Sequence, residues 1–291
     1  MITIDAEAVR QALQFPELVD ALQEAFCSDI TVPPRLHYDM ENPAASRETT
    51  LLMMPAWYAG DVAGIKLVTV APDNATLNLP SILGTYILLD VHTGQMKAMM
   101  DAPSLTAKRT AAASALASRF LSRENSSTLL MVGTGTLSPE IIRAHSSVRP
   151  INKVYVWGRS IEKAQSVCDQ VKELDLECIA IDDINAHIAD ADIISCATLS
   201  QTPLIFGKHL KAGQHLDMVG AYRPDMREAD DNCVRRSRII VDNFDTAIRE
   251  TGDLKITAAI KDVIASSQSE INLEAAPFEP EVGFGSYNAV E

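Results

Sequence analysis

The sequence predicts an α/β protein in which a doubly wound parallel sheet is joined to a second, mixed α+β domain. Three observations predict it: strand and helix patterns alternate after residue 127, a glycine turn follows a buried strand, and the N-terminal region is rich in strands. Such alternation implies a parallel sheet covered on both faces. We expect the doubly wound domain at 116–260 and the mixed domain at 1–115, which an irregular C-terminal tail, 261–291, rejoins.

The elements follow in order along the chain. Apolar residues at helical spacing predict a helix over 5–27, and apolar runs predict strands within 50–70 and 80–100. An alanine-rich run at 105–121 predicts a helix that leads into the second domain. The strands of the parallel sheet are expected at 129–132, 153–157, 177–181, 192–196, 216–219 and 238–242.

Composition excludes several classes of function. The net charge of −14 over 291 residues argues against nucleic acid as a partner, because a phosphate backbone needs a basic surface. The N-terminus has no pattern of a signal peptide and no apolar run is long enough for a membrane span, so we expect a cytoplasmic protein. The five cysteines and six histidines lack the spacing of a disulfide framework or a metal site.

A glycine turn, Gly133-Thr134-Gly135, separates a predicted buried strand from a predicted helix. Gly133 allows a tight turn, and Gly135 allows a phosphate to approach the backbone. The free N–H groups and the dipole at the start of the following helix favour an anion. This context predicts a Rossmann-type dinucleotide site rather than an ordinary turn, although Ser138 replaces the third glycine of the usual pattern. The residues expected at the cofactor are Gly133, Thr134, Gly135, Thr136 and Leu137.

The second strand of this unit ends in Gly158-Arg159-Ser160, without the carboxylate that typically accepts the ribose hydroxyls of NAD. Arg159 and Ser160 could both donate to an additional phosphate. A charge-assisted hydrogen bond contributes about 1.5–3 kcal/mol, or about tenfold to hundredfold in affinity. We therefore expect NADPH to be preferred and NADH to remain possible, unless Arg159 is only a solvated surface residue. Further cofactor contacts are expected where later strands end, at Cys196, Ala197, Thr198 and Gly220.

Several short segments precede the glycine turn in a characteristic order. They are Gly64-Ile65-Lys66-Leu67-Val68, Leu79-Pro80 with Gly84, Leu88-Leu89-Asp90 with Thr93-Gly94, Met99-Met100-Asp101, Leu105 to Ala112, and Ser114 to Ala117. Together they resemble the ornithine cyclodeaminase and mu-crystallin family over about residues 30–255. The resemblance implies a homodimer in which a nicotinamide-binding Rossmann domain and a substrate and dimerisation domain enclose the active site.

The resemblance also implies three cationic active-site residues. Arg109 matches a substrate-binding arginine, and its planar guanidinium suits a carboxylate. Arg35 and Lys66 match two further cationic positions, and burial of Lys66 would lower its pKa and suit it to proton transfer. The simpler alternatives are an ion pair for Arg109, a surface turn for Arg35 and a lysine that extends from an edge strand into water.

One position distinguishes subgroups of the family. Tyr222 occupies the place of the catalytic Asp of the cyclodeaminases, and a phenol is a poor base near neutral pH. The segment Gly220-Ala221-Tyr222-Arg223-Pro224-Asp225 instead resembles ketimine reductases. The implied reaction is NADPH-dependent reduction of a small cyclic imino acid, Δ1-pyrroline-2-carboxylate or Δ1-piperideine-2-carboxylate, to L-proline or L-pipecolate. The alternatives are an ornithine cyclodeaminase, an alanine-type amino-acid dehydrogenase, and a non-catalytic crystallin-like protein that binds NADPH and a small ligand.

Overall fold

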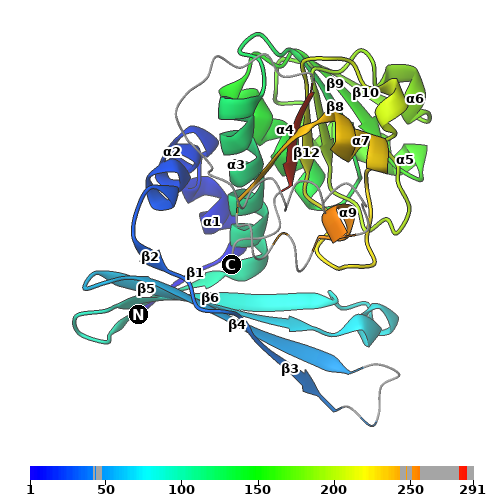
Figure 1. Cartoon of the computed structure of the whole chain (residues 1–291). Coiled ribbons are helices and arrows are strands. Elements are labelled where there is room, and N and C mark those ends of the chain that lie inside the picture. Colours follow the sequence, from blue (N-terminus) through cyan, green and yellow to red (C-terminus); the bar gives the residue numbers. More distant parts are fainter. Residues whose placement is uncertain (42, 44–47, 243–246, 248–250, 256–281, 287–291) are drawn as a thin grey trace. The chain divides into compact units, whose positions relative to one another are not determined.

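The computed structural model describes residues 1–41, 43, 48–242, 247, 251–255 and 282–286. The chain divides into two compact units, Met1–Arg109 and Thr110–Val290 (Figure 1). This division falls within helix α3 (Ala102–Leu121), as does the expected boundary between residues 115 and 116. Among the helices that the structure describes, none has the length and apolar character needed to cross a bilayer.

The first unit contains a seven-stranded mixed sheet with the order β1-β7-β6-β5-β4-β2, and β3 also pairs with β4. Strand β1 runs parallel to β7, whereas the other neighbours are antiparallel. Figure 1 shows the long, twisted strands of this sheet. The strands are β1 (Ile2–Ile4), β2 (Ile30–Thr31), β3 (Leu36–Met40), β4 (Thr49–Tyr58), β5 (Val62–Val70), β6 (Ile82–Asp90) and β7 (Met96–Asp101), and a short helix, η1 (Pro72–Leu77), connects β5 to β6.

Two prolines have clear positions in the first unit, and one of them explains a difference from the sequence prediction. The helix expected over 5–27 is two helices, α1 (Ala6–Ala12) and α2 (Phe15–Phe26), because Pro16 lies in the first turn of α2, where a missing N–H is tolerated. Pro55 lies inside β4, between the residues that pair with β3 and those that pair with β2. A residue without an N–H fits at the point where the outer neighbour of the strand changes.

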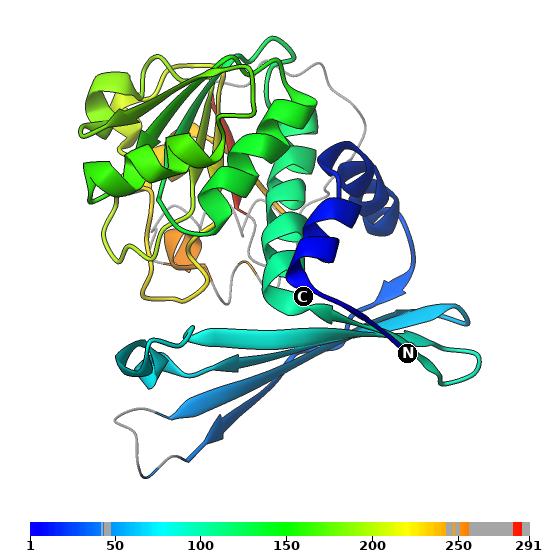
Figure 2. The ribbon, with the colours of Figure 1, turned by 180° about the vertical axis from the view of Figure 1, so that it is seen from behind.

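The second unit contains a parallel seven-stranded sheet with the order β10-β9-β8-β11-β12-β14-β13. The doubly wound parallel sheet is therefore confirmed. Helices α4 and α5 cover one face (Figure 2). The elements are β8 (Thr128–Val132), α4 (Leu137–Val148), β9 (Lys153–Trp157), α5 (Ile161–Gln170), β10 (Glu177–Ile181), α6 (Ile184–His187), β11 (Ile193–Cys196), η2 (Gly207–His209), β12 (Gln214–Met218), α7 (Asp231–Arg236), β13 (Arg238–Val241), α9 (Gly252–Lys255) and β14 (Val282–Ser286).

The C-terminal segment differs from expectation. Residues 282–286 form β14, which lies between β12 and β13 in the second sheet, whereas the sequence predicted an irregular tail that rejoins the first domain. Glycine is unfavourable in β-strands. Because glycines alternate in Val282-Gly-Phe-Gly-Ser286, the segment lacks the residue pattern from which a strand is predicted. The rest of the predicted tail, 261–281 and 287–291, lies outside the described residues, as do 256–260 of the predicted doubly wound domain.

A buried polar network links helices and central strands of the second unit. Asp217 on β12 is fully buried and accepts hydrogen bonds from Ser195 Oγ on β11 (2.6 Å) and from Ser114 Oγ on α3 (3.1 Å). His145 Nε2 on α4 lies 3.3 Å from the same carboxylate. Burial opposes ionisation of Asp217, but hydrogen bonding and charge from His145 and the hydrogen bond from Ser195 outweigh it, so the pKa of Asp217 lies below its usual value. One carboxylate therefore joins two helices and two central strands.

Candidate functional site

The glycine turn follows β8 where the order of the parallel strands reverses, between β8 and β11. Gly133 has φ +130°, a conformation that favours glycine, and its N–H donates to Trp157 O at the end of β9 (2.9 Å). A Cβ at this position would lie only 2.6 Å from Ala197 O. The main chain that follows β11 therefore requires glycine here. In open α/β sheets, ligands bind at this reversal of strand order.

The start of α4 has the properties of an anion site. Ser138, in place of the third glycine, is fully buried and donates from Oγ to Gly133 O (2.9 Å), so its hydroxyl closes the turn. Gly135 and Thr136 are exposed, and no heavy atom lies within 4 Å of a Cβ built at Gly135. Thr136 makes no side-chain cap to the helix within the described part of the chain. Backbone N–H groups at such a helix start fit a pyrophosphate.

The remaining residues that the sequence predicts at the cofactor lie within the glycine turn or directly after it. Thr134 and Leu137 are half-buried. A Cβ at Gly158 would collide with the Thr134 side chain, so Gly158 allows the turn to approach the end of β9. The structure thus brings the glycine turn and the end of the second strand into contact, as the dinucleotide prediction requires.

The end of β9 leads into helix α5 through Arg159 and Ser160. Arg159 is exposed, and Ser160 is the N-cap of α5, where its Oγ accepts from Lys163 N (3.2 Å). The same hydroxyl donates to Glu162 Oε2 (2.6 Å), and this bond lowers the pKa of Glu162. A carboxylate therefore lies beside Ser160, although the strand end Gly158-Arg159-Ser160 carries none. Because the Ser160 proton is already engaged, Arg159 is the stronger of the two expected donors to an additional phosphate.

The segments after β11 and β12 complete the edge of the sheet. Ala197 is half-buried and its N–H donates to Val132 O (2.9 Å), which sets it beside the glycine turn. Gly220 is buried, and a Cβ on it would collide with the main chain of Thr198. Cys196 is fully buried, and burial raises the pKa of its thiol, which opposes a nucleophilic role.

Glu228, which was not predicted from the sequence as a site residue, binds both segments. Its Oε1 accepts from Thr198 N (2.7 Å) and Oε2 accepts from Gly220 N (2.8 Å). The partners lie 30 and 8 residues away along the chain, so no local spacing reveals them. The only available signal was an acidic residue shortly after a predicted strand end.

The first unit holds the three predicted cations. Lys66 lies on β5 and is 8% exposed, so its predicted burial is confirmed. It is opposite Met54 of β4 and Tyr86 of β6. Tyr86 extends over Gly64, because a Cβ on Gly64 would collide with Tyr86 Oη. Burial raises the pKa of this tyrosine. The lysine therefore lies in a largely enclosed row of side chains on one face of the sheet.

The two arginines lie in the same unit as Lys66. Arg35 is half-buried and precedes Leu36, which pairs with Met53; Met54, the next residue of β4, pairs with Lys66. Arg35 and Lys66 therefore flank β4 at neighbouring positions. Arg109 is half-buried on α3, the helix that directly follows β7. Within the described ranges, no three His, Cys, Asp or Glu side chains gather to hold a metal ion.

The parallel sheet, its strand order and the glycine turn define the second unit as a Rossmann-type fold. The profile of the ornithine cyclodeaminase/mu-crystallin family matches residues 2–272, and the chain belongs to this family. The resemblance stated from the short segments is thereby confirmed.

Named relatives are similar over most of the chain. Δ1-Pyrroline-2-carboxylate reductase of Colwellia psychrerythraea is 37% identical over 265 residues, 89% of this chain and 83% of its own. Protein SAR DEFICIENT 4 of Arabidopsis thaliana is 40% identical over 237 residues, 78% of this chain and 70% of its own. Among solved structures, Δ1-pyrroline-2-carboxylate reductase of Thermococcus litoralis, in complex with NADH and L-proline, superposes with a TM-score of 0.85 at 24% identity, covering 99% of this chain and 92% of that one.

Proposed function

We propose that this protein reduces a small cyclic ketimine carboxylate, Δ1-pyrroline-2-carboxylate or Δ1-piperideine-2-carboxylate, with a reduced nicotinamide cofactor. The observation that carries the proposal is the glycine turn at the start of α4, in a chain that is 37% identical to a reductase of this substrate class. A bound nicotinamide would supply the hydride. The turn, the open helix start and the β11 and β12 segments would hold the cofactor.

The three cations of the first unit fit the other half of the reaction. Reduction of C=N needs a hydride on carbon and a proton on nitrogen, and a protonated nitrogen makes the carbon more electrophilic. We assign the proton to the Lys66 ammonium. Arg109 and Arg35 bind the substrate carboxylate, which a guanidinium can hold through two parallel hydrogen bonds. Homodimer formation and a cytoplasmic location remain predictions.

The proposal is tested by a substrate panel. The purified protein is mixed with NADPH or NADH and each candidate, and loss of the reduced-nicotinamide absorbance is followed. We expect turnover with at least one of the two cyclic ketimines. Faster turnover with pyruvate and ammonia would indicate an amino-acid dehydrogenase instead, and release of ammonia from ornithine would indicate a cyclodeaminase. Cofactor binding without turnover across the whole panel would favour a non-catalytic binding protein.

Cofactor preference is a separate prediction. Because Arg159 is exposed at the end of β9, we expect Arg159→Asp to weaken NADPH binding by about tenfold to hundredfold and to change NADH binding far less. The matched variant Glu162→Gln removes the nearby carboxylate and should shift the preference toward NADPH. Kd values for both cofactors, measured by fluorescence titration, check this. Equal losses for both cofactors in Arg159→Asp would contradict the assignment.

A further inference from the structure

The Glu228 carboxylate joins the chain segments that follow two neighbouring strands of the parallel sheet. Its Oε1 accepts from both the N–H and the hydroxyl of Thr198, at 2.7 and 2.6 Å, after β11. Its Oε2 accepts from Gly220 N at 2.8 Å, after β12. The side chain is fully buried. Three donors on one buried carboxylate make a strong link between the two segments.

The linked segments border the glycine turn. A Cβ at Gly133 would lie 2.6 Å from Ala197 O, and one at Gly220 would collide with Thr198. The turn, the β11 segment and the β12 segment are therefore in direct contact, and the position of Thr198 fixes the relation between the other two. A shift in the Glu228 carboxylate would move the edge of the sheet that the proposed function assigns to the cofactor.

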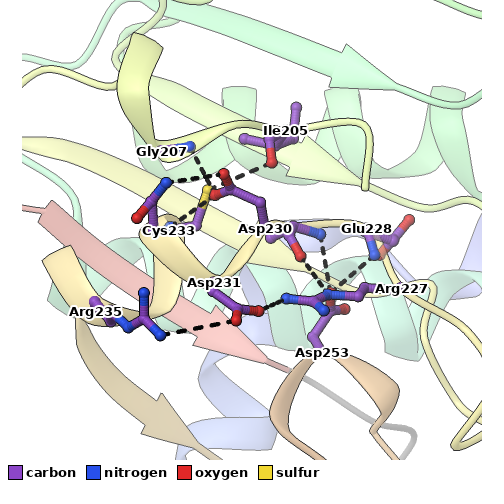
Figure 3. Close-up of polar contacts among 11 residues, drawn as sticks. Ile205, Gly207, Arg227, Glu228, Asp230, Asp231, Cys233, Arg235 and Asp253 are labelled. Atoms are coloured by element: carbon purple, nitrogen blue, oxygen red, sulfur yellow. Dashed lines mark hydrogen bonds and ion pairs between the residues drawn. The ribbon is translucent and has the colours of Figure 1, made fainter. Parts of the chain in front are cut away.

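The backbone of Glu228 is itself held in place. Its N–H donates to Asp253 Oδ1 (2.8 Å), and its carbonyl accepts from Leu204 N and Ile205 N (2.8 and 3.0 Å). Figure 3 shows Asp253 beneath the segment, with Arg227 paired to Asp231 beside it. Because these hydrogen bonds hold both the N–H and the carbonyl of Glu228, the position of its carboxylate does not depend on Thr198 and Gly220 alone.

The charge of this group changes near neutral pH. Burial raises the pKa of Glu228 to about 8; the hydrogen bonds from Thr198 and Gly220 oppose the shift and the charge of Asp253 adds to it. The charge of Glu228 in turn raises the pKa of the Cys196 thiol, and the charge of Arg227 lowers the pKa of Asp253. Protonation places a hydrogen on an oxygen that now accepts a hydrogen bond, so the link to Thr198 or Gly220 is weakened.

We propose that Glu228 is a positioning residue whose ionised carboxylate holds the Thr198 and Gly220 segments in the conformation that binds the nicotinamide cofactor. The inference rests on the proposed function only in that the cofactor binds at this edge. Glu228 acts on the cofactor site through the Thr198 and Gly220 segments, so the inference requires no contact between Glu228 and the cofactor.

The test measures Kd for NADPH and NADH by fluorescence titration from about pH 6 to about pH 10. In the wild type, affinity should rise with pH through about 8, because the ionised form is the one that holds the segments. Glu228→Gln, which keeps the shape and removes the charge, should bind about tenfold more weakly at the highest pH and should lose the inflection. Thr198→Val, which removes one donor, should cause a smaller loss and keep the inflection.

Asp230→Asn is the matched control. Asp230 is two residues away and also accepts from backbone N–H groups, of Gly207 (2.8 Å) and Cys233 (2.9 Å), but these belong to η2 and α7 (Figure 3). This variant should lose stability without changing the pH dependence of Kd. Wild-type affinity and pH dependence in Glu228→Gln would overturn the inference, as would the same loss of the inflection in Asp230→Asn.

Hydrogen exchange distinguishes the positioning role of Glu228 from the proposed function. The amides of Thr198 and Gly220 should exchange faster in Glu228→Gln than in the wild type, in the absence of any cofactor. If the wild type binds no nicotinamide cofactor, the proposed function fails, whereas the exchange rates still report whether Glu228 holds the two segments. Unchanged exchange at both amides would overturn the positioning role whatever the cofactor does.

Discussion

Replacing Lys66 with alanine is expected to lower kcat by about 10²- to 10⁴-fold, the usual contribution of a positioned proton donor, while Kd for the cofactor stays within about twofold. The reason lies in the position of the side chain. Lys66 is 8% exposed on β5, in the first unit, whereas the glycine turn and the segments assigned to the cofactor belong to the second. Loss of the ammonium should therefore affect the proton and not the cofactor.

The measurement compares turnover with the best ketimine of the panel and cofactor affinity in the same preparations. Lys97→Ala is the matched control, because Lys97 lies on β7 of the same sheet but is half exposed and paired with Asp90 (3.1 Å). It should retain wild-type kcat. Wild-type turnover in Lys66→Ala would remove Lys66 from the mechanism. Equal losses of turnover in the two variants would point to a general effect of charge on this sheet.

Replacing Asp217 with alanine is expected to lower the free energy of unfolding by about 3–5 kcal/mol, as is typical when one partner of a buried charged network is removed. Ser195, Ser114 and His145 all bond to this carboxylate, and all four side chains are fully buried. The variant leaves buried donors without an acceptor and also opens a cavity among the central strands. The loss therefore combines unsatisfied polar groups with poorer packing.

Urea denaturation followed by far-ultraviolet circular dichroism measures this loss. Asp169→Ala is the control: Asp169 is an exposed acid on α5 that pairs with Lys172 (2.9 Å), and its removal should leave the unfolding free energy unchanged within experimental error. The sign of the pH effect also follows. Because the pKa of Asp217 is lowered in the fold, its stabilising contribution is present above about pH 3.8 and is lost as the pH falls below that value. A loss under about 1 kcal/mol in Asp217→Ala would show that the network is dispensable.

The second unit was the more predictable part of the fold. Strands such as β8 and β11 are buried along their length, so they read as continuous apolar runs, and the Gly133 turn carries a recognisable spacing. Ser138 shows the limit of such patterns: the residue departs from the glycine pattern, but its hydroxyl closes the turn in a way that only the structure reveals. The local sequence thus predicted the glycine turn, but not the hydrogen bond from Ser138 that closes it.

The parts that escaped prediction depend on distant partners. Glu228 is defined by Thr198 and Gly220, and Tyr86 by its position over Gly64 on a neighbouring strand. The contact between Ser160 and Glu162 is local, yet the sequence pattern of the strand end did not predict that the serine hydroxyl donates to this carboxylate. Burial of Lys66 was predicted from its apolar neighbours and is confirmed, because Lys66 lies on the face of β5 on which Gly64 and Val68 are also buried.

The place of β14 in the sheet has a consequence for synthesis of the chain. This strand is made after β12 and β13, yet it lies between them and pairs with both. While the ribosome is still producing residues before 282, β12 has no neighbour on that side, and β13 cannot join the sheet through this strand. Exposed strand edges promote aggregation of nascent polypeptides. A stop codon introduced upstream of residue 282 should therefore yield insoluble protein rather than a shorter soluble one.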